Sequence, residues 1–187
     1  MIEFAGKPTK IKEQERKTPK AVTREAYVKM TEPYRRDPAR ARRLQRENRL
    51  LVLLLMAAYA GLLLWLLVTR NPLLVRAICV PLDGFLAVSV FRFLRNRSRP
   101  YETFDLPPVI PREGKGKSFP SRHVFSAAVI AVTTCMIPGL LIPGVILLAL
   151  SLRIARIRVI SGVHYPSDVI AAIAIALAAG WIGFCVI

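Results

Sequence analysis

Residues 50 to 68 read LLVLLLMAAYAGLLLWLLV, a run of nineteen positions without a charged side chain. At about 1.5 Å of rise per residue, a helix of this length covers about 30 Å of hydrocarbon. The run therefore predicts a transmembrane helix and an integral membrane protein. A long charged region precedes it, so we expect no cleavable signal peptide.

A longer apolar stretch, 124 to 152, has no charge over twenty-nine positions, too many for one ordinary span. Two Pro-Gly pairs interrupt it, so we interpret it as two helices joined by a turn near 138 to 144. Two further transmembrane helices are predicted from weaker or shorter apolar segments at about 72 to 91 and 167 to 187. The sequence thus predicts an all-α, polytopic helical membrane bundle of about five transmembrane helices, forming a membrane-embedded domain over 50 to 187.

Residues 1 to 49 form a basic N-terminal tail, with fifteen Lys or Arg against seven Asp or Glu. Few apolar residues and several prolines predict that the tail is partly disordered or amphipathic. Its last part is rich in arginine and directly precedes the first span, which suits the anionic cytoplasmic leaflet of a bilayer. No interleaved aromatic pattern or known nucleic-acid motif is present, so we expect the lipid bilayer and no nucleic acid as partner.

The expected helices also predict the topology. An even number of crossings separates the tail, the polar loop at 92 to 120 and the polar break at 153 to 166, so all three lie on one side of the membrane. Nearly all the positive charge gathers there, and the positive-inside rule makes that side cytoplasmic. We therefore expect a multi-pass protein of the cell membrane, with its N-terminus and its site facing the cytoplasm. Boundary arginines outside the candidate site are interpreted as topology anchors: Arg95, Arg97, Arg153 and Arg156.

The chain has only two histidines, His123 and His164, and both fall on this face among arginines. Guanidinium groups match the oxygens of a phosphate and keep their charge at any relevant pH. One imidazole can act as nucleophile or base while the other donates a proton. Asp168, four residues after His164, is placed to hold the Nδ1 proton and leave Nε2 free for attack. The pattern indicates chemistry on a phosphate ester.

Three stretches carry a resemblance to a known family: RFLRNRSRP at 92 to 100, PSRH at 120 to 123 and RVISGVHYPSD at 158 to 168. In order and spacing they resemble the signature motifs KxxxxxxRP, PSGH and SRxxxxxHxxxD of the phosphatidic acid phosphatase type 2 superfamily. That superfamily also includes the vanadium haloperoxidases. The resemblance covers about residues 50 to 187.

The resemblance implies roles for the matching residues. His164 would attack the phosphorus and form a phosphohistidine, with Asp168 orienting it. His123 would protonate the leaving oxygen and then activate water. Such enzymes need no metal or other cofactor. The residues implied in binding the substrate phosphate are Arg92, Arg99, Ser121, Arg122 and Arg158.

This chain departs from the family pattern at three positions. Arg92 replaces lysine, which keeps the charge and changes the donor geometry. Arg122 stands in place of glycine. Two roles are open for it: a contact to the substrate phosphate, or an anchor at the membrane interface. Ile157 replaces serine and removes one potential hydrogen bond.

The expected function is metal-independent hydrolysis of a lipid phosphate or lipid diphosphate, the substrate being an isoprenoid diphosphate or a phosphatidic-acid-like lipid. The alternatives are a non-catalytic membrane protein that binds lipid phosphates through a decayed site and, ranked lower, a vanadate-dependent haloperoxidase. The three cysteines all lie in apolar stretches without ligand spacing, so we expect neither disulfides nor a zinc site.

Overall fold

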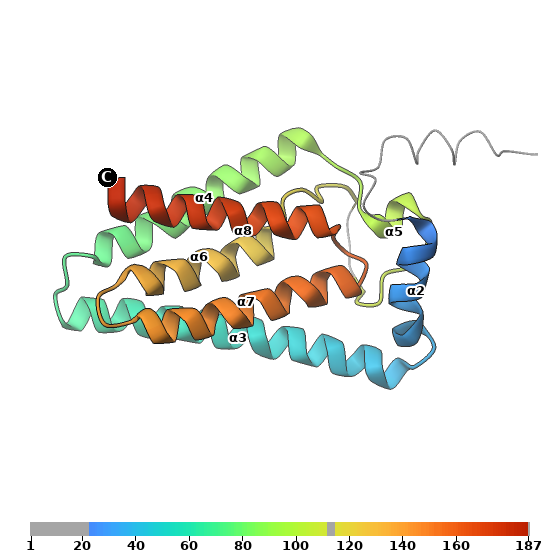
Figure 1. Ribbon diagram of the computed structural model, residues 1–187, viewed down its shortest axis with the longest axis horizontal. Coiled ribbons are helices and arrows are strands. Elements are labelled where there is room, and N and C mark those ends of the chain that lie inside the picture. Colours follow the sequence, from blue (N-terminus) through green and yellow to red (C-terminus); the bar gives the residue numbers. More distant parts are fainter. Residues whose placement is uncertain (1–22, 112–114, 187) are drawn as a thin grey trace, which may run out of the picture.

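The computed structural model describes residues 23–111 and 115–186. Within these residues the chain is helical and contains no strand, which confirms the predicted all-α bundle. Two short helices lie at one end of the body, and a π-helix, η1, continues the last long helix (Figure 1). The long helices are α3 (Pro38–Val68), α4 (Leu74–Arg95), α6 (Arg122–Met136), α7 (Leu141–Ile160) and α8 (Pro166–Trp181); the others are α2 (Arg24–Arg35), α5 (Pro100–Thr103) and η1 (Ile182–Val186).

The five long helices correspond to the five apolar segments predicted. Within the described part of the chain, three segments are long and apolar enough to cross a membrane: Pro38–Val68, Leu74–Thr103 and Pro166–Val186. Helix α6 is shorter, with 15 residues. Helix α7 has 20 residues, but arginines enter its last two turns.

Helix α6 forms the centre of the bundle. From Val124 to Thr134 every side chain except that of Ser126 is buried, as expected for a helix that is apolar on all sides. Helix α7 approaches it closely at Gly144, where a Cβ atom would lie 2.6 Å from the backbone nitrogen of Cys135. Only glycine permits this approach. Pro143 and Gly144 lie in the first turn of α7, so the connection from α6 covers only 137–140 and is shorter than the predicted turn near 138 to 144.

Helix α3 begins well before the apolar run. Asp37 caps it by accepting hydrogen bonds from the N–H groups of Ala39 and Arg40 at 2.9 and 3.2 Å, and Pro38 occupies the first helical position. The arginine-rich segment is therefore helical and continuous with the span. Residues 1–22 of the predicted tail lie outside the described residues.

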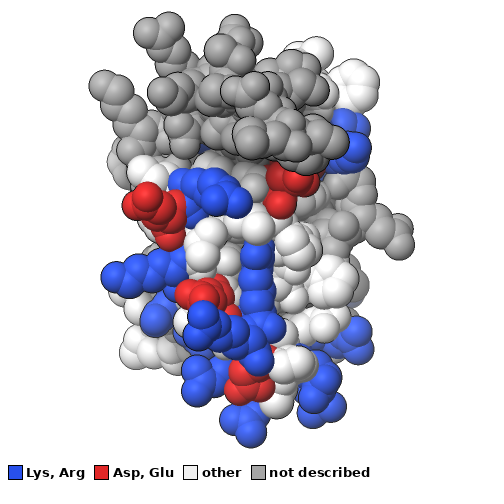
Figure 2. Space-filling view, turned by 90° about the vertical axis from the view of Figure 1, so that its right-hand side faces the viewer, with Lys and Arg blue, Asp and Glu red and all other residues white. Residues whose placement is uncertain are grey.

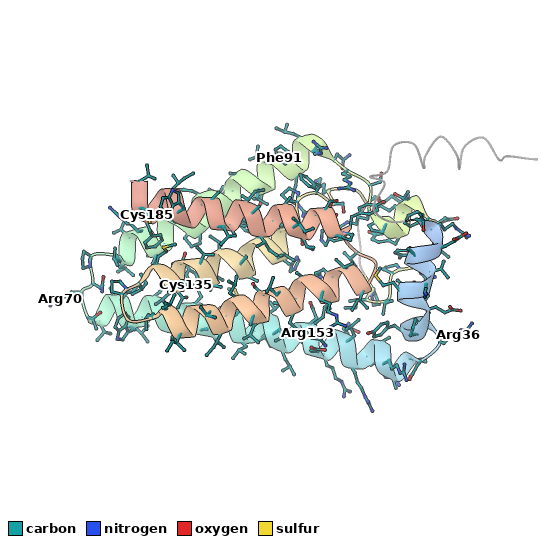
Figure 3. All side chains as sticks on the ribbon, in the orientation of Figure 1. Arg36, Arg70, Phe91, Cys135, Arg153 and Cys185 are labelled. Carbon is teal, nitrogen blue, oxygen red and sulfur yellow. The ribbon has the colours of Figure 1, made fainter. Side chains whose placement is uncertain are left out.

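Glu47 on α3 forms a two-pronged ion pair with Arg153 on α7, with nitrogen to oxygen distances of 2.5 and 2.9 Å. Figure 3 shows Arg153 between these two helices. This expected topology anchor thus also joins two helices.

One end of the bundle collects the polar segments. The start of α3, the loop between α4 and α6 and the bend between α7 and α8 all lie there, whereas the other two connections and the C-terminus lie at the opposite end (Figure 1). This agrees with the predicted shared side. Figure 2 shows this end from outside, with Lys and Arg side chains spread over it and acidic ones between them.

Candidate active site

Hydrogen bonds join the three sequence motifs at this end of the bundle. The buried side chain of Arg92, in the last turn of α4, donates to the carbonyl of Pro120. The next N–H along the chain, that of Ser121, donates to the backbone carbonyl of Asp168 at 3.0 Å. The start of α6 is therefore fixed between the end of α4 and the start of α8.

Ser121 occupies the N-cap position of α6 and is fully buried. Its Oγ makes no hydrogen bond to any residue within 23–111 or 115–186. A buried hydroxyl without a hydrogen-bond partner lowers the stability of the fold, so Ser121 Oγ marks a position where a ligand oxygen could accept its hydrogen bond. The first N–H groups of a helix also favour an anion at the same place.

His164 lies in the bend between α7 and α8. The bend turns at Gly162, whose φ is +73°, and the N–H groups of Val163 and His164 donate to the carbonyl of Arg158 at 3.3 and 3.2 Å. The imidazole is 2% exposed, and its Nδ1 lies 3.4 Å from Oδ2 of Asp168. The predicted pair of His164 and Asp168 is thus in place, with the carboxylate in the first turn of α8.

Burial is the main cause that lowers the pKa of His164, to about 4. The hydrogen bond to Asp168 acts in the opposite direction, and the positive charges of Arg99 and Arg92 lower the pKa further. The imidazole is consequently neutral near pH 7. With a carboxylate facing Nδ1, its single proton belongs on Nδ1, which leaves the lone pair of Nε2 for a reaction.

Asp168 has further partners that sequence reasoning missed. Oδ1 accepts a hydrogen bond from Arg97 at 2.7 Å, and Oδ2 accepts from Ser118 Oγ at 2.5 Å and from the N–H of Tyr165 at 3.0 Å. Arg97 also lies over the ring of Tyr165, 4.3 Å from its centroid. Arg97 was expected to be a topology anchor like Arg95. Their spacing in the sequence does not distinguish the two arginines. They differ in the structure because α4 ends between them at Asn96, whose φ of +37° lies in the left-handed region and turns the chain.

Arg99 is 2% exposed and holds the loop that precedes α6. Its guanidinium donates to the carbonyls of Gly116, Lys117 and Val163 at 2.9, 3.3 and 3.3 Å. Because Val163 directly precedes His164, Arg99 fixes the bend as well as placing a positive charge near the imidazole.

Arg122 and His123 lie in the first turn of α6. Arg158, the remaining predicted phosphate ligand, is buried near the end of α7. Arg122 is exposed, with its guanidinium 5.4 Å from the ring centroid of Phe85, and His123 is half-buried. Both border a pocket of about 250 Å³ whose other walls are mainly apolar. Those walls come from four helices: Val52, Leu55, Met56, Phe85, Ser126, Ala127, Ile130 and Ile154.

The described part of the chain has no group of three or more His, Cys, Asp or Glu side chains that could hold a metal ion. The donors gathered at the site are cationic and hydroxyl groups, which suit an anion.

Comparisons with known proteins show the family and the fold of this chain. The family model of the PAP2 superfamily matches residues 49–187. The crystal structure of Aquifex aeolicus LpxE is similar with a TM-score of 0.65 and 23% identity, over 85% of this chain and 92% of that one. The crystal structure of a transmembrane PAP2 type phosphatidylglycerolphosphate phosphatase from Bacillus subtilis has a TM-score of 0.63 and 21% identity, over 91% and 88%. At these identities both show a shared fold. Among curated proteins no match was found.

Proposed function

Because the chain belongs to the PAP2 superfamily, we propose that it is a membrane phosphatase that hydrolyses a lipid phosphate or lipid diphosphate without a metal ion. The observation that carries the proposal is the buried pair of His164 and Asp168, with Nδ1 and Oδ2 3.4 Å apart. This pair lies where an unpartnered Ser121 hydroxyl and a helix N-terminus offer donors to an anion.

In the proposed reaction, Nε2 of His164 attacks the phosphorus, and the bond from phosphorus to the leaving oxygen breaks. His123 gives its proton to that oxygen. His123 then takes a proton from water, whose oxygen attacks the phosphohistidine, and inorganic phosphate leaves with Nε2 restored. The arginines stabilise the charge on the transferring group: Arg92, Arg99, Arg122 and Arg158.

The pocket beside His123 supports a lipid substrate. Its walls are mainly apolar, and three of its lining residues carry polar side chains: Arg122, His123 and Ser126, all in the first turns of α6. A prenyl or acyl chain seated there would leave its phosphate at the start of α6. Isoprenoid diphosphates and phosphatidic-acid-like lipids are the proposed substrates.

The proposal is tested by measuring phosphate release from a panel of lipid phosphates, using purified protein in detergent with EDTA. We expect release by the wild type and loss of it in His164→Ala. Arg92→Ala should also lose activity, whereas Arg95→Ala is a matched control because Arg95 ends the same helix with an exposed side chain. Release that survives His164→Ala would exclude the nucleophile, and release from no substrate would leave a lipid-phosphate-binding protein.

We propose that the site faces the cytoplasm, because α3 carries exposed arginines, Arg42, Arg43 and Arg46, on its polar first turns at the same end of the bundle as the site. A reporter enzyme active only in the cytoplasm, fused to the N-terminus, should be active. Activity only of an extracytoplasmic reporter would reverse the orientation.

A further inference from the structure

Helix α2 lies outside the region that the family model matches, which begins at residue 49. It crosses the end of the bundle where the bend between α7 and α8 emerges (Figure 1). Its inner face carries Tyr27 and Thr31, one helical turn apart, and both are fully buried. Helix α2 is therefore packed against the end of the helical bundle, and its contacts show which segments it fixes in place.

The first contact is with the bend itself. A Cβ atom at Gly162 would lie 2.7 Å from Cε2 and 2.8 Å from Cζ of Tyr27, so the ring fills the space that a side chain would take. Gly162 also has a φ of +73°, which favours glycine. Tyr27 thus rests directly on the turn two residues before His164.

The second contact is on the other side of His164. The rings of Tyr27 and Phe104 are 5.2 Å apart between centroids, and Tyr165 joins the same buried cluster. The hydroxyl of Tyr165 donates to Thr103 Oγ1 at 2.9 Å. The residue that follows His164 is therefore held by the cluster that contains Tyr27.

The last turn of α2 is attached through a third point. Arg35 donates to the carbonyl of Pro107 at 2.5 Å. Two residues further on, the N–H of Val109 donates to the carbonyl of Ser161 at 3.0 Å, in the same bend. The loop that follows α5 is thus held between α2 and the bend.

We propose that α2 is a strap that fixes the position of the His164 bend, with Tyr27 as its positioning residue. Neither Gly162 nor Tyr165 can shift while the Tyr27 ring is seated, so the imidazole between them keeps its place relative to Asp168. Tyr27 does not touch the substrate, so its loss slows the chemical step and leaves substrate binding unchanged. The expected effect on kcat rests on the proposed phosphatase function, whereas the expected effect on the mobility of the bend does not.

The test compares three substitutions in the full-length protein in detergent: Tyr27→Phe, Tyr27→Leu and Tyr27→Ala. Two quantities are measured, the kinetics of phosphate release and the hydrogen–deuterium exchange of residues 158–165. Tyr27→Phe keeps the ring and should stay within about twofold of wild type. Tyr27→Ala should lower kcat by about 10- to 100-fold, the range expected for a misplacement of about 1 Å, with an unchanged KM. Exchange at residues 158–165 should become faster.

Tyr27→Leu preserves an apolar side chain for folding but lacks the ring, so it should show the same loss if Tyr27→Ala does not fold. Lys29→Ala, on the exposed face of α2, is the matched control and should match wild type. The proposal is overturned if folded Tyr27→Leu or Tyr27→Ala keeps wild-type kcat and exchange, or raises KM alone. A wild type that releases no phosphate refutes the proposed function instead, and the exchange measurement still decides whether the strap exists.

Discussion

The guanidinium of Arg97 lies 2.7 Å from Oδ1 of Asp168, while the other oxygen of the same carboxylate faces Nδ1 of His164. Asp168 is fully buried and Arg97 is 17% exposed. The carboxylate is therefore oriented by a cation on one side and an imidazole on the other.

Loss of this cation should affect both stability and activity. Arg97→Ala leaves a buried carboxylate without its ion pair, which costs about 3 to 5 kcal/mol in comparable cases. We expect a lower Tm and a kcat reduced by at least about tenfold, with partial recovery in Arg97→Lys. The control is Arg95→Ala, whose guanidinium stacks over Phe119 at the exterior, 5.1 Å from the ring centroid. Equal effects of the two alanine substitutions would contradict the assigned role.

The low pKa of His164 predicts how stability depends on pH. The folded value of about 4 lies below the ordinary 6.5, so between these pH values the unfolded chain binds a proton that the folded chain does not. The stability contributed by neutral His164 is full above pH 6.5 and is lost as the pH falls towards 4, by about 3 kcal/mol in total. Thermal unfolding of wild type should show this loss, and His164→Gln should show less of it. If Tm depends on pH in the same way in wild type and His164→Gln, the lowered pKa of His164 is refuted.

Two fully buried serines, Ser118 and Ser121, should respond in opposite ways. Ser118 Oγ donates to Asp168, so Ser118→Ala should lower the unfolding free energy by about 1 to 3 kcal/mol. Ser121 Oγ has no partner in the described part of the chain, so Ser121→Ala should leave Tm unchanged or raise it while lowering kcat/KM by about tenfold. Denaturation and phosphate release measured on both variants distinguish the roles. A destabilised Ser121→Ala would show that this hydroxyl serves the fold.

The proposed proton donor can be tested through the leaving group. A lipid monophosphate expels an alkoxide, a strong base, whereas a lipid diphosphate expels a phosphate ester, a far weaker base. His123→Ala should therefore slow a monophosphate by about 10²- to 10⁴-fold and a diphosphate much less. Single-turnover rates with both substrates of one chain length measure the difference. Equal slowing of the two substrates in His123→Ala would indicate that His123 acts in substrate binding and not as the proton donor.

Arg122 should act on substrate selection. Its guanidinium is exposed beside Phe85 and borders the apolar pocket, so its removal has little effect on the fold. Arg122→Gly, which restores the residue of the family motif, should raise KM for a diphosphate by about tenfold, the effect of losing one charge-assisted contact. KM for the corresponding monophosphate should change less. An unchanged ratio of the two KM values would make Arg122 an interfacial anchor.

The sequence predicted the helices because they follow from short-range signals, and it predicted that the three motifs share one end of the bundle because an even number of crossings separates them. Apolar runs such as 50 to 68 and the break at Pro138-Gly139 define helices without any knowledge of contacts, whereas Pro143-Gly144 lies inside α7. The partners of Asp168 were not predictable in this way. Arg97 and Ser118 reach the carboxylate because of the left-handed Asn96 and the loop held by Arg99, which depend on tertiary packing.

The N-terminal region shows the same limit. Its composition predicts a basic tail that is partly disordered or amphipathic, and the described part, from residue 23 on, is mostly helical. Tyr27 alone gives no sign that it is buried, since its partner Gly162 lies far away in the sequence.

The shortness of α6 has a consequence for the two products of the proposed reaction. Its 15 residues rise about 22 Å, less than the roughly 30 Å of hydrocarbon in a bilayer. Its first turn can therefore lie below the headgroup plane, at the end of the bundle that carries the site. In the proposed reaction, phosphate released there would pass into water, while the lipid product, already at the depth of its neighbours' tails, would diffuse away within the bilayer. Departure into two different solvents separates the products and disfavours the reverse reaction.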